Sequence, residues 1–218
     1  LTYVTVGPTD LPAASIKELE HLKIVASGGA IAADISGGAV EDVLETLSVK
    51  GDGAYNIDVS ANAKAVVVEN ISGNNAVAID DAGTAATTPD KITTVSIKNT
   101  GTGAITVGAT NNVDSLTTLN LTKTSGNADV TAAAGTRALT IGLDSVTGGT
   151  LTDATATTVT VKSTGTASSG ITLTTVAATG VTLAAESAKL TLADVNLTAA
   201  TSIAASGSKA ITITATSD

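Results

Sequence analysis

The chain has 218 residues and a formal net charge of −9, so it repels phosphate backbones and anionic headgroups, and we expect it to bind no nucleic acid. It contains no Cys, Met, Trp or Phe, which excludes disulfides, thiol chemistry and cysteine-bound zinc. Its 43% of hydrophobic residues are almost all Ala, Val, Ile and Leu, and they suit a narrow core without room for aromatic rings. No apolar run approaches the ~20 residues of a membrane span, so we expect no direct membrane insertion.

The first forty residues leave two alternatives open. Thr9, Asp10 and Pro12 precede a stretch of helix-forming residues that reaches Leu22, an order typical of a capped helix. A short helix here would cover the open end of a repeat array, whose terminal units are expected to be atypical. Alternatively, residues 19–24 form the first strand of the array. We therefore assign residues 1–40 to an N-terminal cap or first rung, and residues 41–218 to a repeat region.

A pattern of apolar–x–apolar residues recurs along the rest of the chain. A typical copy is Leu119-Asn120-Leu121, and successive copies follow at unequal steps. A second apolar series follows the first by about ten to thirteen residues, with clusters of Gly, Ser, Asn and Asp between them that are turn signals. The first series begins at Leu22, Leu47, Val66, Val95, Leu119, Leu139, Val159, Leu190 and Ile211. The second series comprises Ile57, Val77, Ile105, Val130, Leu151, Ile171 and Ile203.

The two series predict an all-β fold, a parallel β-solenoid (β-helix) with two short strands per rung of about 20–25 residues. Side chains alternate along a strand, so a run such as Ile211-Thr212-Ile213 places Ile inside and Thr outside. A two-strand unit cannot bury its own apolar face, and stacking on neighbouring rungs must bury it. A tandem of immunoglobulin-like sandwiches is the competing interpretation. We favour the solenoid because sandwich cores usually carry a large aromatic residue.

Three aspartates are the candidate metal ligands. Asp80 and Asp81 form the densest carboxylate site, and Asp90 follows them in the same loop region. Carboxylate oxygens are the ligands that Ca²⁺ prefers, which makes calcium the one cofactor that we expect. The alternative is a pair of solvated loop acids without a metal.

Enzymatic activity is not expected. The only histidine, His21, alternates with Leu22 and so points outward, and no phosphate-binding or dinucleotide motif is present. Paired carboxylates in a groove can hydrolyse saccharides, but such enzymes usually add aromatic platforms, and this chain has only two tyrosines. The other carboxylates considered for such a pair are Asp42, Asp52 and Asp58.

Runs such as residues 116–122 and 156–163, in an acidic chain rich in Thr, Ala, Gly and Val and without sulfur, resemble the strand repeats of bacterial surface-layer proteins and large adhesins. The resemblance covers about residues 40–218. It implies a secreted protein of the cell surface that assembles with itself into a lattice or filament, often with calcium, and that reaches cell-envelope polysaccharide through segments outside this sequence. The glycine-rich calcium nonapeptide of many relatives is absent here, since Gly148-Gly149 and the other Gly pairs lack the Gly-x-Asp that must follow.

These observations favour a structural repeat domain that self-assembles into a surface layer or extracellular filament. The alternative is the stalk or binding module of an adhesin or phage fibre. Because no Met is present, we expect the chain to be a processed product or part of a longer protein. Outward pairs such as Thr158 and Thr160 also suggest ice binding as a different function. Ice binding needs a regular array of threonines, and we expect rungs of unequal length to disturb such an array.

Overall fold

The computed structural model describes residues 2–5, 19–27, 30–35, 44–59, 62–71, 73–81, 91–108 and 113–215. These residues form two parallel β-sheets and no helix. The ten-stranded sheet comprises, in spatial order, β1 (Thr2–Thr5), β2 (His21–Ala26), β4 (Thr46–Gly51), β6 (Ala65–Asn70), β8 (Thr94–Gly101), β10 (Thr118–Thr124), β12 (Ala138–Asp144), β14 (Thr158–Ser163), β16 (Gly180–Ala185) and β18 (Ser202–Ser206). The nine-stranded sheet comprises β3 (Ile31–Ile35), β5 (Tyr55–Val59), β7 (Val77–Asp81), β9 (Ile105–Val107), β11 (Ala128–Val130), β13 (Thr150–Asp153), β15 (Ser168–Thr174), β17 (Leu190–Asn196) and β19 (Ile211–Ile213).

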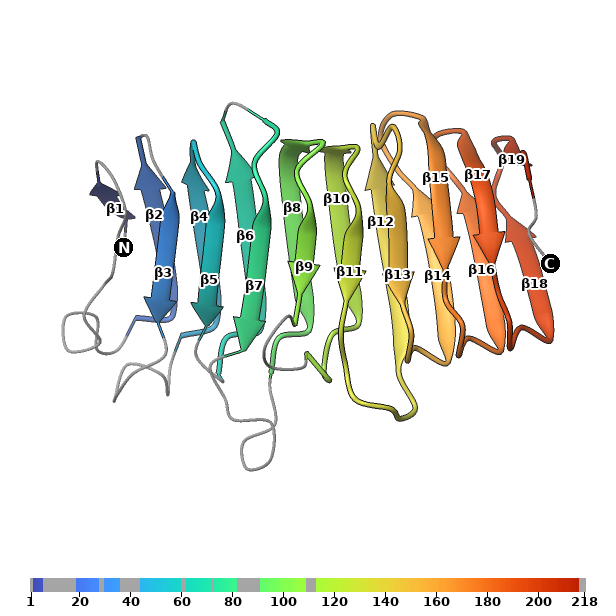
Figure 1. Ribbon diagram of the computed structural model, residues 1–218, viewed down its shortest axis with the longest axis horizontal. Coiled ribbons are helices and arrows are strands. Elements are labelled where there is room, and N and C mark those ends of the chain that lie inside the picture. The colour runs from blue at the N-terminus through green and yellow to red at the C-terminus, as the bar shows by residue number, and fades with distance from the viewer. Residues whose placement is uncertain are drawn as a thin grey trace.

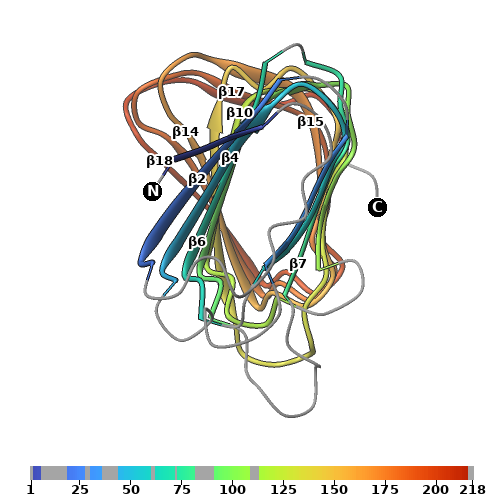
Figure 2. The ribbon, with the colours of Figure 1, turned by 90° about the vertical axis from the view of Figure 1, so that its left-hand side faces the viewer.

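The chain winds through the two sheets alternately, so each coil adds one strand to each sheet (Figure 1). Every strand pair is parallel, as between β14 and β16, where Val159 lies opposite Val181. Viewed along the axis, the two sheets are the walls of a flattened tube, and the C-terminal coils are turned relative to the N-terminal ones (Figure 2). The parallel β-solenoid that the sequence predicts is therefore confirmed. The sandwich alternative is wrong, because sandwiches are built from antiparallel strands.

A single apolar core runs the length of the tube. In β10, Leu119 and Leu121 are buried, whereas the alternating residues Thr118 and Asn120 are partly exposed. Most other strands alternate in the same way. β-branched and aliphatic side chains fill this thin interior, in which each coil stacks on the next. One aromatic ring is also accommodated: Tyr55 of β5 is buried in the core, contrary to the expectation that rings have no place there.

The predicted strand series needs correction in the C-terminal half. Val181-Thr182-Leu183 forms part of β16 in the ten-stranded sheet, a strand that the apolar pattern missed. As a result, Leu190 and Ile211 belong to the nine-stranded sheet and Ile203 to the ten-stranded one, the reverse of the prediction. The apolar–x–apolar pattern is the same in both sheets because both bury one face, so the pattern alone cannot assign a strand to its sheet.

In the C-terminal half of the solenoid, the coil length is more regular than the sequence indicated. The residue opposite Leu119 is Ile141, two positions beyond the predicted Leu139. In the same sheet Val159 lies opposite Val181, and Val181 lies opposite Ile203, so these two successive coils are equally long. The long step that the prediction placed between Val159 and Leu190 arose from the missed strand.

The described part of the N-terminal region belongs to the solenoid. β2 pairs with β1 on one side and β4 on the other, and β3 pairs with β5. Residues 6–18, which contain most of the predicted helix, lie outside the described residues. The proposed boundary between residues 40 and 41 also lies outside them and stays a prediction.

One corner of the solenoid is packed so closely that it requires glycine. Gly103, Gly126 and Gly149 occupy the same position in three successive coils, just before β9, β11 and β13. A Cβ atom at Gly126 would collide with the carbonyl oxygen of Gly103, and one at Gly149 with that of Gly126. The backbones of neighbouring coils therefore touch here. The Gly clusters that the sequence offered as turn signals mark this contact.

A buried ion pair closes another corner. Arg137, just before β12, donates from Nη2 to Oδ2 of Asp153 at 2.5 Å and from Nη1 to the carbonyl oxygen of Leu116 at 3.2 Å. Oδ1 of Asp153 accepts the backbone N–H groups of Thr155 and Ala156 at 3.0 and 2.8 Å. Both side chains of the pair are almost fully buried, at 6% and 1% exposure. Three coils are thus joined through one guanidinium group and one carboxylate.

We expect stability to fall at high pH because of Tyr55. Its hydroxyl lies 2.6 Å from the carbonyl oxygen of Gly51 and 3.0 Å from that of Glu69. Burial raises the pKa of Tyr55 to about 12. In the unfolded chain the pKa of tyrosine is about 10. The contribution of protonated Tyr55 to the free energy of unfolding is therefore complete below pH ~10 and is lost as the pH rises toward ~12, a loss of about 2–3 kcal/mol in all. Urea unfolding at pH 9 and at pH 11.5 measures the loss. Tyr55→Phe should remove this part of the pH dependence, and an unchanged dependence in that variant would contradict the assignment.

Candidate functional site

The three predicted calcium ligands are not brought together by the described residues. Asp80 and Asp81 are consecutive in β7, so their side chains leave opposite faces of the strand. Asp90 lies outside the described residues. Among the residues that the structure describes, no three His, Cys, Asp or Glu side chains are grouped as a metal site would require. Calcium binding at these aspartates therefore stays a prediction.

Asp80 instead belongs to a column of acids that the sequence analysis missed. It lies opposite Asp58 of β5, which in turn lies opposite Asp34 of β3. Asp58 and Asp80 therefore lie on neighbouring strands, whose spacing is about 4.8 Å. The signal was present in the sequence, because Asp58 and Asp80 both follow an inward Ile at the same place in their strands.

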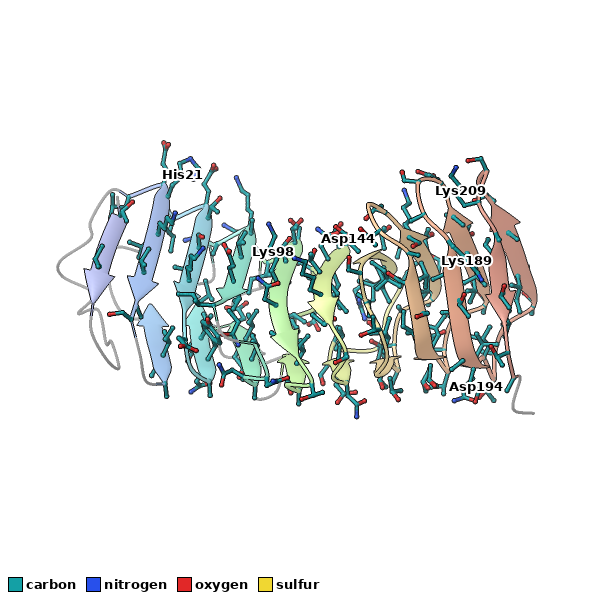
Figure 3. All side chains as sticks on the ribbon, turned by 90° about the horizontal axis from the view of Figure 1, so that it is seen from above. His21, Lys98, Asp144, Lys189, Asp194 and Lys209 are labelled. Atoms are coloured by element: carbon teal, nitrogen blue, oxygen red, sulfur yellow. The ribbon has the colours of Figure 1, made fainter. Side chains whose placement is uncertain are left out.

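Of the described residues considered for catalysis, Asp58 and Asp80 lie opposite one another on β5 and β7, while His21 and Asp52 lie elsewhere. His21 is exposed at the start of β2, on the outer side of the ten-stranded sheet (Figure 3). Asp52 lies in the corner after β4, and Asp42 lies outside the described residues. No described helix is long and apolar enough to cross a membrane.

Threonines form a single file across the outer face of the ten-stranded sheet. Each lies opposite the next, although the coils between them differ in length, because extra residues are taken up in the corners. The sequence-based argument that unequal rungs disturb the register is therefore wrong. The file is one residue wide, since the neighbouring column holds four different residues. The file comprises Thr94, Thr118, Thr140, Thr160 and Thr182. The neighbouring column comprises Ser96, Asn120, Gly142 and Lys162.

A polar hollow interrupts this face at Gly142, which we call the Gly142 notch. It has a volume of about 270 Å³. Its walls come from two adjacent columns of the sheet, on strands β8, β10 and β12, and from the corner after β14. Figure 3 shows Lys98 and Asp144 on this face near the middle of the solenoid, where its upper outline dips. The polar side chains around Gly142 are Ser96, Lys98, Asn120, Thr122, Asp144 and Thr164.

Hydrogen bonds hold two of the notch side chains in place. Asn120 donates from Nδ2 to Oγ of Ser96 at 3.2 Å. Oδ1 of Asp144 accepts the backbone N–H of Thr166 at 2.8 Å and the hydroxyl of Ser145 at 3.2 Å. The second carboxylate oxygen of Asp144 can accept a further bond. The notch is thus lined by groups that are already oriented.

Paired charges flank the notch on its N-terminal side. Nζ of Lys50 lies 2.8 Å from Oε1 of Glu69, and Lys98 occupies the next position in the same column. The hydrogen bond from Lys50 lowers the pKa of Glu69, and the charges of Lys98 and Lys23 add to this effect. A second exposed pair joins Glu45 and Lys64, whose hydrogen bond lowers the pKa of Glu45. Two exposed ion pairs thus lie on the N-terminal half of this face, with Lys23 and Lys98 as further positive charges.

Within the described residues, nothing covers the last coil, which we call the open last coil. Ile203 of β18 and Ile213 of β19 occupy core positions, because they lie opposite Val181 and Leu192 of the preceding coil. No described residue stacks on them, and they are 55% and 36% exposed. A hollow of about 240 Å³ lies at this end, between Ala205 and Ile211. In this part of the chain, the apolar side chains and the two strand edges of the last coil are therefore uncovered.

Comparison of the chain with models of protein families, with curated proteins and with solved structures finds no match in any of the three. The assignment as a β-solenoid therefore depends on the strand pairing described above. Two surfaces stand out as candidates for function: the open last coil and the Gly142 notch.

Proposed function

We propose that this chain is a structural repeat unit of a secreted cell-surface protein whose copies assemble end to end into a surface layer or extracellular filament. The observation that carries the proposal is the stacking of similar coils along one axis, because each coil buries its apolar residues only against the next one. The acidic composition without Cys or Met and the resemblance to surface-layer and adhesin repeats support a location outside the cell. No enzymatic role is part of the proposal.

Three of the four edge strands, β1, β18 and β19, contain no charged residue and no Pro, whereas β3 contains Asp34. Natural proteins protect exposed edges with charged residues, Pro or bulges. β18 reads Ser-Ile-Ala-Ala-Ser and β19 reads Ile-Thr-Ile, so neither contains a charge or a proline. β1, at the other end of the ten-stranded sheet, reads Thr-Tyr-Val-Thr and exposes Val4. Both ends of this sheet thus offer uncharged edges.

The direction of the strands favours head-to-tail association. β1 and β18 lie at opposite ends of one parallel sheet, so they run in the same direction (Figure 1). A second copy placed along the axis would present its β1 to β18 in parallel orientation. Contacts between unlike surfaces form a closed ring only if the rotation from one copy to the next permits it. Otherwise they generate open filaments. Calcium remains an expected partner of this assembly through the acidic residues.

We expect Ile203→Lys to abolish assembly. The substitution places a charge on the exposed edge, as natural edge strands do, and it leaves the packed coils untouched. The matched control is Ile71→Lys, because Ile71 is 54% exposed but lies in the corner after β6, far from the last coil. Sedimentation velocity and negative-stain electron microscopy, each with and without Ca²⁺, should show filaments or oligomers for the wild type and the control, and monomers for Ile203→Lys. A wild type that stays a monodisperse monomer under all conditions would overturn the proposal and favour the stalk or binding module of an adhesin or phage fibre.

A further inference from the structure

Gly142 has no conformational reason to be glycine. It lies inside β12, its φ is not in the left-handed region, and its neighbours in the sheet are Asn120 and Lys162. Glycine inside a strand costs roughly 0.5–1 kcal/mol relative to Ala. Such a glycine often marks a place where a ligand or another backbone approaches closely. The atoms nearest to an added Cβ at residue 142 all belong to Asn120, so the glycine makes room for that side chain and leaves the adjoining hollow open to a ligand.

A side chain at residue 142 would change the notch and not the core. A Cβ atom there would lie 2.5 Å from Oδ1 of Asn120, which is the end of a flexible side chain. The amide of Asn120 would have to move, and the added atoms would occupy the space above the strand. The absence of a side chain at this one position therefore preserves both the hollow and the orientation of Asn120.

The chemistry of the walls selects a neutral, hydroxyl-rich ligand. The hydroxyls of Ser96, Thr122 and Thr164 and the amide of Asn120 can each donate and accept hydrogen bonds, as the vicinal hydroxyls of a sugar also do. Lys98 and Asp144 lie one strand to either side of Thr122 in a single column. Their opposite charges cancel, so the notch as a whole favours no net charge on a ligand.

The size and shape of the notch set an upper limit to the ligand. Sites for drug-sized ligands have volumes of about 300–1,000 Å³. At about 270 Å³ the notch is smaller, and it opens on the outer face of the sheet, where a chain can continue along the surface. These dimensions suit one or two rings of a longer chain.

We propose that the Gly142 notch binds one or two rings of a neutral saccharide, with Asn120, Asp144 and Lys98 making the polar contacts. Because hydrogen bonds already hold Asn120 and Asp144 in place, less side-chain conformational entropy is lost when a ligand binds. This site is separate from the open last coil, so saccharide binding does not depend on assembly of the chain.

The test uses Gly142→Thr and, as its matched control, Gly180→Thr. Gly180 also faces outward on the ten-stranded sheet, and a Cβ atom there makes only ordinary contacts, at 3.6 Å or more, with Ser202 and Thr158. Thr favours strands more than Gly does, so neither variant should lose stability. Thermal unfolding checks that both remain folded.

Saturation-transfer NMR with maltotriose, cellotriose and chitotriose measures binding, with tri-galacturonate as the charged comparison. We expect at least one neutral trisaccharide to bind the wild type and Gly180→Thr equally, to shift the side-chain amide signals of Asn120, and to bind Gly142→Thr at least tenfold more weakly. The proposal is overturned if no neutral trisaccharide binds, if only the galacturonate binds, or if Gly142→Thr binds as well as the wild type. Filament formation by the same Gly142→Thr sample shows independently whether assembly is intact.

Discussion

Replacement of Arg137 by Met should destabilise the solenoid by about 3–5 kcal/mol, the usual cost of leaving one member of a buried ion pair without its partner. Asp153, at 1% exposure, would lose its cationic partner and would retain only its hydrogen bonds to the corner around Thr155. The carbonyl oxygen of Leu116 would also lose a donor. Urea unfolding followed by circular dichroism measures the loss.

An exposed pair in the same protein is the control. Lys50→Met removes the partner of Glu69, but both of these side chains are more than a third exposed, so the expected loss is at most about 1 kcal/mol. The double variant Arg137→Met with Asp153→Asn should be more stable than Arg137→Met alone, because the amide keeps an oxygen for the N–H groups of the corner and leaves no buried charge. Equal losses for Arg137→Met and Lys50→Met would show that burial of the pair has no energetic consequence.

Gly126→Ala should cost on the order of 3 kcal/mol, because its single added methyl group meets backbone and not a movable side chain. The collision is with the carbonyl oxygen of Gly103 in the preceding coil, and relief requires the two coils to separate. Hydrogen exchange should therefore become faster in β9 and β11 on either side of this corner, together with a lower unfolding midpoint.

Gly135→Ala provides the matched control. It is the same substitution in the next corner along the chain, between β11 and β12, but nothing lies within 4 Å of the Cβ position. Its φ is not left-handed, so Ala fits without strain and should leave stability unchanged or raise it by about 0.4–1 kcal/mol through the unfolded state. If both variants unfolded at the same midpoint as the wild type, the close contact at Gly126 would not exist in solution.

The fold could be predicted from the sequence because short stretches of a few residues are enough to indicate the strands and the corners of a solenoid. Alternation in runs such as Leu119-Asn120-Leu121 determines which side chains are inside, and Gly-rich clusters mark the corners. The pairing of strands was harder to predict, because β-branched repeats look alike in every coil. The series skipped Val181-Thr182-Leu183, and the strands after it were assigned to the wrong sheets.

The Gly142 notch could not be predicted for the same reason. It exists only because Asn120 of one coil lies opposite Gly142 of the next. The predicted pairing of Leu119 with Leu139 would have put Gly142 opposite Thr122. An error of two positions keeps every side chain on its correct face, so the predicted fold is unaffected, but it separates the residues of a site built from neighbouring strands.

The parallel coils also determine how the molecule responds to tension. The hydrogen bonds between coils run along the long axis, and β1 and β19 lie at its two ends (Figure 1). A pull between the ends therefore loads the bonds of one terminal coil at a time, so that the solenoid unzips and does not shear. Each coil that opens releases roughly 75 Å of extended chain, at about 3.4 Å per residue. A filament of such units would behave as an extensible tether that yields one coil at a time and absorbs mechanical work as it lengthens.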